Sequence, residues 1–384
     1  MIPYSTQDIT ESDLAAVRDA LTSGWLTQGP AVPRFEAAFE QAHRAPHAVA
    51  VCNATAALHL GCLALGVGPG SRVWTSPNSF VASANCAAYC GAEVQFVDID
   101  PRTRNLSIQA LADKLERARR DNALPDVVIP VDFSGLPCDL AEIRGLAEQH
   151  GFRVLEDASH AVGASYRGVP VSGGWAHASV FSFHAVKIIT TAEGGLVTTD
   201  DAALARRVAL LRSHGMTRDP AEMTRLPEGP WVYEQRWLGF NYRMTDVQAA
   251  LGASQITRLS DMQKRRQRLA QRYDELLAAL PLVRPIELPD RVSSLHLYVV
   301  EIDEAHCATA RATVFNRLRS AGIGVNVHYI PIHLQPYWRD RGFGTGDFPN
   351  AEAYYHRALS LPLFPAMTDG QQDTVAGALA AALT

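Results

Sequence analysis

The stretch that decides the fold is residues 153–199, RVLEDASHAVGASYRGVPVSGGWAHASVFSFHAVKIITTAEGGLVTT. Apolar runs predict strands at 153–155, 180–183 and 195–199, with turn regions between them. The carboxylate of Asp157 follows the first of these strands, and the amine of Lys187 follows the second. Open α/β sheets bind ligands at the carboxyl ends of their strands, so both side chains are candidates for a functional site.

The same alternation of short strands and longer helices continues on both sides of this stretch. Further strands are predicted at 47–52, 72–75, 93–97 and 126–131, and helices at 12–22, 31–45, 55–64, 79–89 and 140–150. After residue 245, a long helical pattern at 246–280 precedes strands at 296–302 and 325–329 and helices at 310–320, 351–358 and 369–383. We therefore expect an α/β sheet covered on both faces, in a large domain over residues 1–250, and a smaller α+β domain over residues 251–384.

Composition excludes several other classes of protein. The 384 residues are 47% apolar and 20% charged, which fits a globular chain and argues against disorder. A net charge of −5 provides no broad basic face for nucleic acid. The amino terminus lacks the basic and apolar regions of a signal peptide, and no apolar run is long enough to span a membrane.

The cysteines and histidines indicate neither a disulfide framework nor a metal site. The six cysteines are scattered and form no CxxC pair, so we expect a reducing, cytoplasmic setting. His328 and His333 lie close together in the sequence, but no carboxylate completes a set of metal ligands. We therefore expect no metal.

Lysine is rare in this chain, which makes each lysine informative. Only Lys114, Lys187 and Lys264 are found among 35 lysines and arginines. Lys114 and Lys264 lie in charged helical patterns and are expected to be solvated. Lys187 lies in the apolar segment 178–190, where a structural salt bridge is the alternative to a chemical role, and an amine can react where a guanidinium cannot.

Asp157 and Lys187 together indicate a pyridoxal phosphate site. In such a site a lysine binds the cofactor covalently, and a carboxylate keeps the pyridine nitrogen protonated so that the ring can accept electrons. Taken alone, Asp157 is equally consistent with the amino-terminal cap of a helix. The apolar surroundings of Lys187 make a purely structural ion pair costly, which favours the chemical role.

The remaining parts of a cofactor site are also present in the sequence. The strand-to-helix turn at 53–58 and the hydroxyls of Thr55 and Ser182 suit a phosphate group, and Phe80 suits a cover for the ring. Each of these residues alone is more simply a helix cap or a core side chain. His160 and His184 lie near this set in sequence, although a lone histidine is more often structural.

Four segments of the chain resemble the DegT/DnrJ/EryC1/StrS family of sugar aminotransferases. They are Asp157–Gly163 (DASHAVG), Ser179–Lys187 (SVFSFHAVK), Thr190–Gly195 (TTAEGG) and Asn241–Met244 (NYRM). The resemblance extends over essentially the whole chain. It implies a fold-type-I pyridoxal-phosphate-dependent transferase, with a large, mixed and mostly parallel seven-stranded sheet and a smaller α+β carboxyl-terminal domain.

The family pattern implies roles for individual residues. Lys187 matches the Schiff-base lysine, Asp157 matches the partner of the pyridine nitrogen, and Phe80 matches the aromatic residue that stacks on the ring. Thr55, Ala56 and Ser182 match the phosphate site, and His160 belongs to the same cofactor-binding set. Asn241 matches an asparagine that reaches the cofactor phosphate of the neighbouring subunit, which implies a homodimer with shared active sites. The substrate-contacting positions are Tyr4, Gly24, Trp25, Leu26, Thr27, His184, His328, Tyr329, Ile330 and Pro331.

The resemblance also implies a reaction. Segments 182–195 and 211–216 are similar to the altrosamine transaminase branch of pseudaminic acid biosynthesis, and Ala185 and Ser213 fit that branch, whereas many members have Pro and Asn there. The expected reaction moves an amino group from L-glutamate to C4 of a UDP-linked 4-keto-6-deoxy-N-acetylhexosamine. In the dehydratase branch a histidine replaces the lysine, so Lys187 favours transamination.

Three alternatives remain open at this point. The acceptor could be a different UDP- or dTDP-linked keto sugar. The chain could be a non-transaminating pyridoxal phosphate sensor on the same fold, although the intact Lys187 and Asp157 argue against this. A lyase or decarboxylase on the same fold would share the cofactor, so only amine transfer to a keto sugar separates it from a transaminase.

Overall fold

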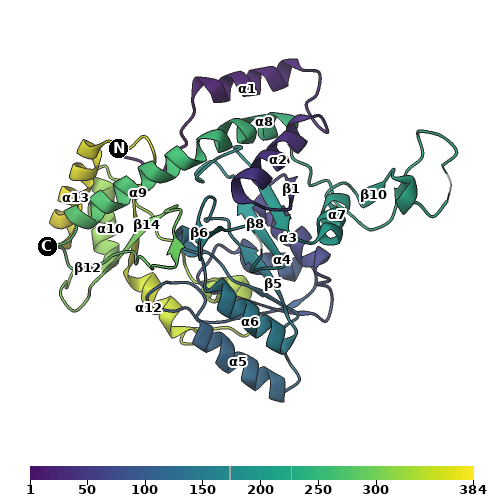
Figure 1. Cartoon of the computed structure of the whole chain (residues 1–384). Helices are drawn as coiled ribbons and strands as arrows, with labels where there is room; N and C mark the ends of the chain where they lie inside the picture. Colours follow the sequence, from purple (N-terminus) through teal and green to yellow (C-terminus); the bar gives the residue numbers. More distant parts are fainter. Residues whose placement is uncertain (173, 226) are drawn as a thin grey trace.

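A seven-stranded sheet in the order β1–β9–β8–β5–β4–β2–β3 forms the centre of the computed structural model, which describes residues 1–172, 174–225 and 227–384 (Figure 1). Its strands are β1 (His47–Val51), β2 (Arg72–Thr75), β3 (Glu93–Phe96), β4 (Val127–Ile129), β5 (Arg153–Asp157), β8 (Ala178–Ser182) and β9 (Gly195–Thr199). Strands β3, β2, β4, β5 and β8 pair in parallel, and β9 is antiparallel to both β8 and β1. The expected mixed, mostly parallel sheet is therefore confirmed.

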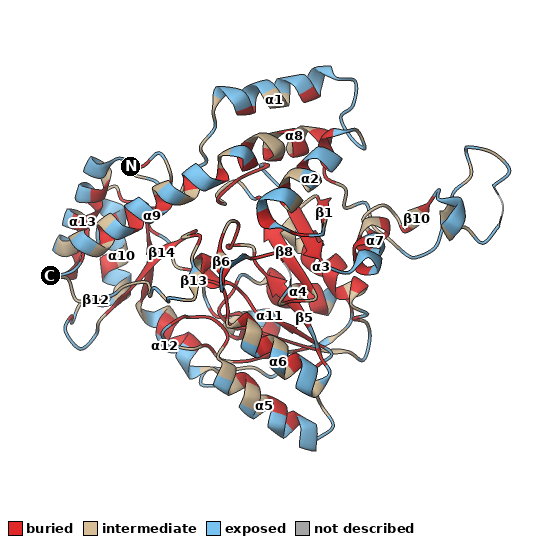
Figure 2. Cartoon of the chain, viewed as in Figure 1, coloured by how far each residue is buried: buried red, intermediate tan, exposed pale blue. Residues whose placement is uncertain are grey.

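Helices cover both faces of this sheet. One face packs against α3 (Ala54–Ala64), α4 (Ala82–Tyr89) and α7 (Ala202–Leu211). The other face packs against α2 (Ala31–His43), α5 (Ile108–Arg120), α6 (Leu140–His150) and α8 (Asp246–Gln255). Strands β8 and β9 are buried at every position, as Figure 2 shows for β8, which explains why their sequences contain no charged residues and no outward polar face.

The long helical pattern at 246–280 is two helices rather than one. Helix α8 is followed by a 3₁₀ turn, η3 (Ile256–Arg258), and then by α9 (Leu259–Leu276). Helix α1 (Glu11–Thr22) packs against α8, where the buried carboxylate of Asp13 accepts hydrogen bonds from Ser254 and Gln255. None of the described helices is long and apolar enough to cross a membrane.

The carboxyl-terminal part of the chain builds a second, smaller sheet with its own apolar core. This sheet has the order β12 (Leu282–Val283), β14 (Tyr298–Ile302) and β15 (Ala358–Leu361), and it packs with α9, α10 (Arg311–Ser320) and α13 (Asp369–Leu383). Helix α12 (Pro349–Arg357) precedes β15, and α11 (Pro336–Arg339) is a single turn.

The predicted strand at 325–329 is wrong. Only an isolated pairing of Asn326 with Ser360 is formed, after which the chain turns toward the large sheet, where the amide of Ile332 donates to the carbonyl of Pro77. A short extended segment such as VNVHY, in which valines alternate with polar residues, cannot be told from a strand without knowing its partner. The proposed boundary at residue 250 stays a prediction, because Ile332 and Trp338 pack in the core of the large sheet.

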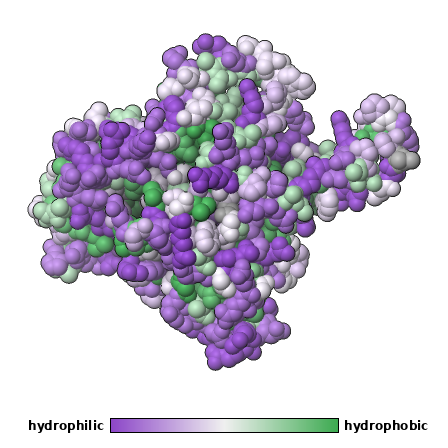
Figure 3. All heavy atoms as spheres, viewed as in Figure 1, coloured by the Kyte–Doolittle hydropathy of each residue, from purple (hydrophilic) through white to green (hydrophobic). Residues whose placement is uncertain are grey.

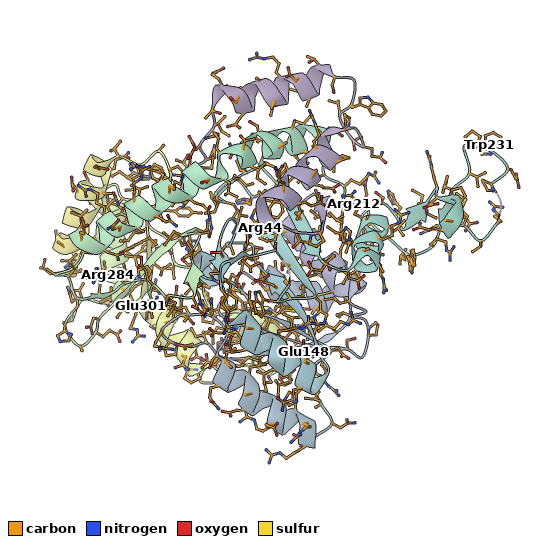
Figure 4. The ribbon with its side chains drawn as sticks, viewed as in Figure 1. Arg44, Glu148, Arg212, Trp231, Arg284 and Glu301 are labelled. Atoms are coloured by element: carbon orange, nitrogen blue, oxygen red, sulfur yellow. The ribbon has the colours of Figure 1, made fainter. Side chains whose placement is uncertain are left out.

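Two small sheets complete the described structure. Strands β6 (Ser165–Tyr166), β7 (Val169–Pro170) and β13 (Arg291–Val292) form one of them. Strands β10 (Met216–Thr217) and β11 (Glu234–Gln235) form a hairpin whose arm projects from the body of the molecule (Figures 1 and 3). Trp231 lies at the tip of this arm (Figure 4).

Candidate active site

The candidate site is a cavity of about 550 Å³ at the carboxyl ends of the central strands. Asp157 is the last residue of β5 and Ser182 is the last residue of the neighbouring parallel strand β8. The cavity lies where ligands of α/β sheets bind. It is lined by the predicted residues Tyr4, Thr55, Phe80, Asp157, His160, Ser182, His184, Lys187, His328 and Tyr329.

The other predicted positions lie outside this cavity lining. The amide of Ala56 donates to the side chain of Asn53, which caps α3, at 2.8 Å. Asn241 is exposed and pairs with Ser213. The turn at 24–27 (Gly24, Trp25, Leu26 and Thr27) is exposed, and Thr27 pairs with Thr245 at the start of α8. Ile330 is also exposed, whereas Pro331 is buried; neither residue lines the cavity. Their assigned roles remain predictions.

Lys187 lies half-buried in this cavity without an ion-pair partner among the residues that the structure describes. Burial lowers the pKa of its amine to about 8, and the negative charge of Asp157 acts in the opposite direction. The amine therefore gives up its proton at a lower pH than an ordinary lysine does, which favours its use as a nucleophile or a proton acceptor.

Lys114 corrects the expectation that the other lysines are solvated. It is half-buried, donates to the carbonyl of Phe96 at 2.8 Å and to the side chain of Gln95 at 3.1 Å, and burial lowers its pKa to about 8 as well. Lys264 is exposed, as predicted. A low pKa alone therefore does not single out Lys187, whereas its place beside Asp157 in the cavity does.

Asp157 is held by hydrogen bonds at both carboxylate oxygens. The hydroxyl of Ser83 donates to Oδ2 at 2.6 Å, and the amide of Ser159 donates to Oδ1 at 3.1 Å. The residues that follow Asp157 form turns and no helix, so Asp157 is not the helix cap that the sequence allowed. It instead presents a fixed carboxylate to the cavity.

Two histidines of the cavity, His160 and His328, are electrically neutral groups. The amide of Ser134 donates to Nδ1 of His160 at 3.2 Å, so neutral His160 carries its proton on Nε2, which faces the hydroxyl of Tyr329 at 3.2 Å. Burial lowers the pKa of His160 well below its usual value, and it lowers the pKa of His328 to about 4. Both rings stay uncharged at neutral pH.

Several lining residues were missed by sequence reasoning. His296 comes from the second lobe, and its ring lies 4.5 Å from that of His160. Glu193 lies at the exposed rim, 3.8 Å from Nε2 of His184. Ser79 and Ser83 flank Phe80 in the sequence, so the turn that carries the aromatic residue was the only signal for them. His296 gave no signal, because only tertiary contacts bring it to the cavity.

A second pair of carboxyl groups is buried directly behind the site. Asp132 and Glu156 are almost fully buried neighbours, and Oδ2 of Asp132 and Oε1 of Glu156 have no hydrogen-bond partner among the described residues. Because carboxylates only accept, we infer that one of the two groups carries a proton and donates it to the other. The amide of Cys138 donates to Asp132 at 2.8 Å, and Ser179 donates to Glu156. Burial raises the pKa of both groups, and the charge of Glu156 raises that of Asp132 further.

This pair predicts a stability that falls as the pH rises. A raised native pKa means that the folded protein retains a proton that the unfolded chain has released above pH ~4. The free energy of unfolding therefore decreases as the pH rises from there to the native pKa, by at most about 1.4 kcal/mol per pH unit. Asp132→Asn can keep both hydrogen bonds without that proton. We expect urea unfolding from pH 5 to 8 to show a smaller decline for Asp132→Asn than for the wild type. Parallel declines would contradict the shared proton.

The residues of the cavity fit pyridoxal phosphate. Lys187 would hold the aldehyde carbon, Asp157 the ring nitrogen and Phe80 the face of the ring. The amino terminus of α3 with Thr55, together with Ser182, would hold the phosphate, since unpaired helix amides and hydroxyls favour an anion. When bound, this cofactor supplies an electron-accepting ring and the carbon that carries the transferred amino group.

This sheet, with a lysine and a carboxylate at the carboxyl ends of its strands, defines a pyridoxal-phosphate-dependent transferase of fold type I. A sequence profile of the DegT/DnrJ/EryC1/StrS aminotransferase family matches residues 7–380. The chain belongs to this family, so it is a pyridoxal-phosphate-dependent aminotransferase, and the resemblance to this family of sugar aminotransferases is confirmed.

Comparison with individual proteins agrees with this assignment. The chain is 42% identical over 378 residues to the spore coat polysaccharide biosynthesis protein SpsC of Bacillus subtilis, covering 97% of this chain and 95% of that protein. PseC of Helicobacter pylori, an aminotransferase involved in the biosynthesis of pseudoaminic acid, superposes with a TM-score of 0.91 at 30% identity, covering 100% and 99% of the two chains. The pyridoxamine phosphate form of the putative sugar aminotransferase Spr1654 from Streptococcus pneumoniae gives 0.90 at 29% identity, with the same coverage.

Proposed function

We propose that this aminotransferase moves an amino group from L-glutamate to C4 of a UDP-linked 4-keto-6-deoxy-N-acetylhexosamine, in pseudaminic acid biosynthesis. The observation that carries the amine transfer is the unpaired, half-buried amine of Lys187 beside the fixed carboxylate of Asp157. Segments 182–195 and 211–216 and the similarity to PseC support the choice of sugar.

The residues of the cavity have different roles in the two half-reactions, the transfer of the amino group from glutamate to the cofactor and from the cofactor to the sugar. Lys187 would hold the cofactor and would also be the group that accepts and returns a proton, for which a pKa of about 8 is well suited. Asp157 holds a positive charge on the ring nitrogen. Uncharged His160 and His328 orient groups by hydrogen bonds and leave Lys187 as the proton carrier.

A second acceptor remains a specific candidate. The relative SpsC is more similar in sequence to this chain than PseC is, and it is a protein of spore coat polysaccharide biosynthesis. The similarity of this chain to SpsC supports a different UDP- or dTDP-linked keto sugar as the acceptor as well as the similarity to PseC supports the proposed one. A few hydrogen bonds to sugar hydroxyls can decide between such acceptors, because a buried polar group that loses its partner costs much affinity.

We also propose that the enzyme works as a homodimer with shared active sites. The β10–β11 arm and the segment after it expose large apolar side chains, with Trp231 71% and Leu238 83% exposed, as well as Tyr233 and Trp237. A second copy of the chain would bury these side chains. Asn241 lies just beyond this segment and is exposed, as a residue that reaches a partner's site must be. The six free cysteines support a cytoplasmic setting.

Asn241→Ala tests the shared site. If Asn241 binds the cofactor phosphate across the interface, we expect the variant to release pyridoxal phosphate roughly 10-fold more readily, because a hydrogen bond to a charged group is lost. Equilibrium dialysis of the holoenzyme measures this release, and sedimentation verifies that the dimer persists. Unchanged retention would remove the contact between subunits.

A single half-reaction tests the proposed function. The holoenzyme is converted with glutamate, freed of the donor and mixed with the UDP-linked 4-keto-6-deoxy-N-acetyl-L-altrosamine precursor. We expect recovery of the absorbance of the pyridoxal form and a 4-amino sugar in the product. Recovery only with an epimeric UDP or dTDP keto sugar would replace the acceptor. No response to glutamate or to any keto sugar would favour a sensor or a lyase.

A further inference from the structure

Two serine hydroxyls form a chain that ends on the carboxylate of Asp157. The hydroxyl oxygens of Ser79 and Ser83 lie 2.7 Å apart, and the hydroxyl of Ser83 donates to Oδ2 of Asp157 at 2.6 Å. All three residues are at least 96% buried. The role of Asp157 in the proposed function does not by itself explain why two further polar groups are buried behind it.

The direction of this chain follows from the chemistry of its members. An ionised carboxylate has no proton and only accepts, so the single hydroxyl proton of Ser83 is committed to Asp157. Ser83 must then accept at its oxygen from Ser79. Hydrogen bonds that are aligned in this way polarise one another, and the donor next to the charge is strengthened.

We propose that Ser83 is a positioning residue for Asp157 and that Ser79 acts through Ser83. The inference rests on the proposed function, because it concerns how Asp157 meets the ring nitrogen of the cofactor. The amide of Ser159 holds Oδ1 at 3.1 Å while Ser83 holds Oδ2, so rotation of the carboxylate about its Cβ–Cγ bond would break one bond or the other.

The same turn also carries the side chain that covers the ring. Phe80 lies between the two serines in sequence, and its carbonyl lies 3.3 Å from the hydroxyl of Ser83. Ser83 is the second residue of α4, whose amino-terminal cap is Val81, the residue after Phe80. A single rigid turn therefore fixes both the ring-stacking residue and the carboxylate that binds the ring nitrogen, and a disturbance at Ser83 reaches both.

Ser83→Ala, Ser79→Ala and the double variant, all as holoenzymes, test this chain. Ser76→Ala is the matched control, because Ser76 is buried in the same segment and, within the described part of the chain, its hydroxyl bonds only to the amide of Asn78. We expect Ser83→Ala to lower kcat and cofactor retention roughly 10-fold and Ser79→Ala roughly 3-fold, with KM for glutamate nearly unchanged. The double variant should be no worse than Ser83→Ala, since Ser79 acts through Ser83.

A spectroscopic signature separates positioning from simple packing. If Asp157 holds the ring nitrogen less well, the ring withdraws fewer electrons, and the nitrogen that joins Lys187 to the cofactor becomes more basic. The pH midpoint of the absorbance change of the bound cofactor should rise by about 0.5 unit in Ser83→Ala, in keeping with a weakened hydrogen bond, and should not move in Ser76→Ala.

Each outcome decides the proposal. A midpoint and a retention in Ser83→Ala equal to those of Ser76→Ala would overturn it, and additive losses in the double variant would overturn the role of Ser79. Both readouts need no amino donor, so they decide the role of Ser83 even if glutamate proves inactive and the proposed function fails. If Ser83→Ala does not fold, Ser79→Ala carries the test, because it leaves α4 unchanged.

Discussion

Lys187→Ala abolishes turnover while leaving the fold intact. The change removes the amine that we propose binds the cofactor and carries the proton, and loss of such a nucleophile costs on the order of 10⁴-fold or more in kcat. Lys187 has no ion-pair partner among the described residues, so its removal strands no carboxylate of an ion pair. Single-turnover absorbance with glutamate and thermal unfolding measure the two parts of this result.

Lys114→Met is the matched control for this experiment. Lys114 is also half-buried with a pKa lowered to about 8, but it lies outside the cavity, beside the ring of Trp74. Methionine keeps most of its apolar stem, so we expect a normal kcat and at most a modest loss of stability. A near-normal rate in Lys187→Ala, or a comparable loss in Lys114→Met, would contradict the role of Lys187.

Asp157→Asn has the second largest expected effect. The amide keeps the shape of the side chain and can still accept from Ser83, but it carries no negative charge to hold a proton on the ring nitrogen. We expect kcat to fall by roughly 10³-fold, because the electrostatic partner of the ring is lost, while glutamate still binds. The pH midpoint of the cofactor absorbance should rise further than in Ser83→Ala.

The Asp157→Asn variant also tests whether Ser83 acts only through Asp157. Combining Ser83→Ala with Asp157→Asn should add little, because Ser83 acts only through the carboxylate. A retained kcat in Asp157→Asn, with pyridoxal phosphate bound, would mean that another group holds the ring nitrogen. Stopped-flow measurement of the glutamate half-reaction separates the chemical step from binding.

Much of the fold was predictable because its signals are local. Apolar runs bounded by turns identified all seven strands of the large sheet, to within a few residues. The strand prediction failed in the second sheet, where the pairing partner decides whether a segment forms a strand. Residues 325–329 alternate valines with polar residues, as a strand would, but form one isolated pairing among the described residues. Strand β15 (Ala358–Leu361) was overlooked next to the end of a predicted helix.

The sequence by itself determined the cofactor and predicted the two residues at the centre of its site. A lysine in an apolar segment of an arginine-rich chain and a carboxylate at the end of another predicted strand can both be seen in the sequence. They can be assigned to one site because the carboxyl ends of neighbouring parallel strands lie at the same edge of the sheet. The family pattern then added the reaction, and the profile match confirmed the family.

The tertiary structure alone decided how these residues are supported. His296 reaches the cavity from the second lobe, Ser134 sets the proton position on His160, and Ser83 holds Asp157 from a different element. Lys114 proved half-buried although its helix is charged. These contacts join residues that are 26 to 136 positions apart in the chain. A local sequence pattern predicts neither the direction of such a hydrogen bond nor how far a side chain is buried.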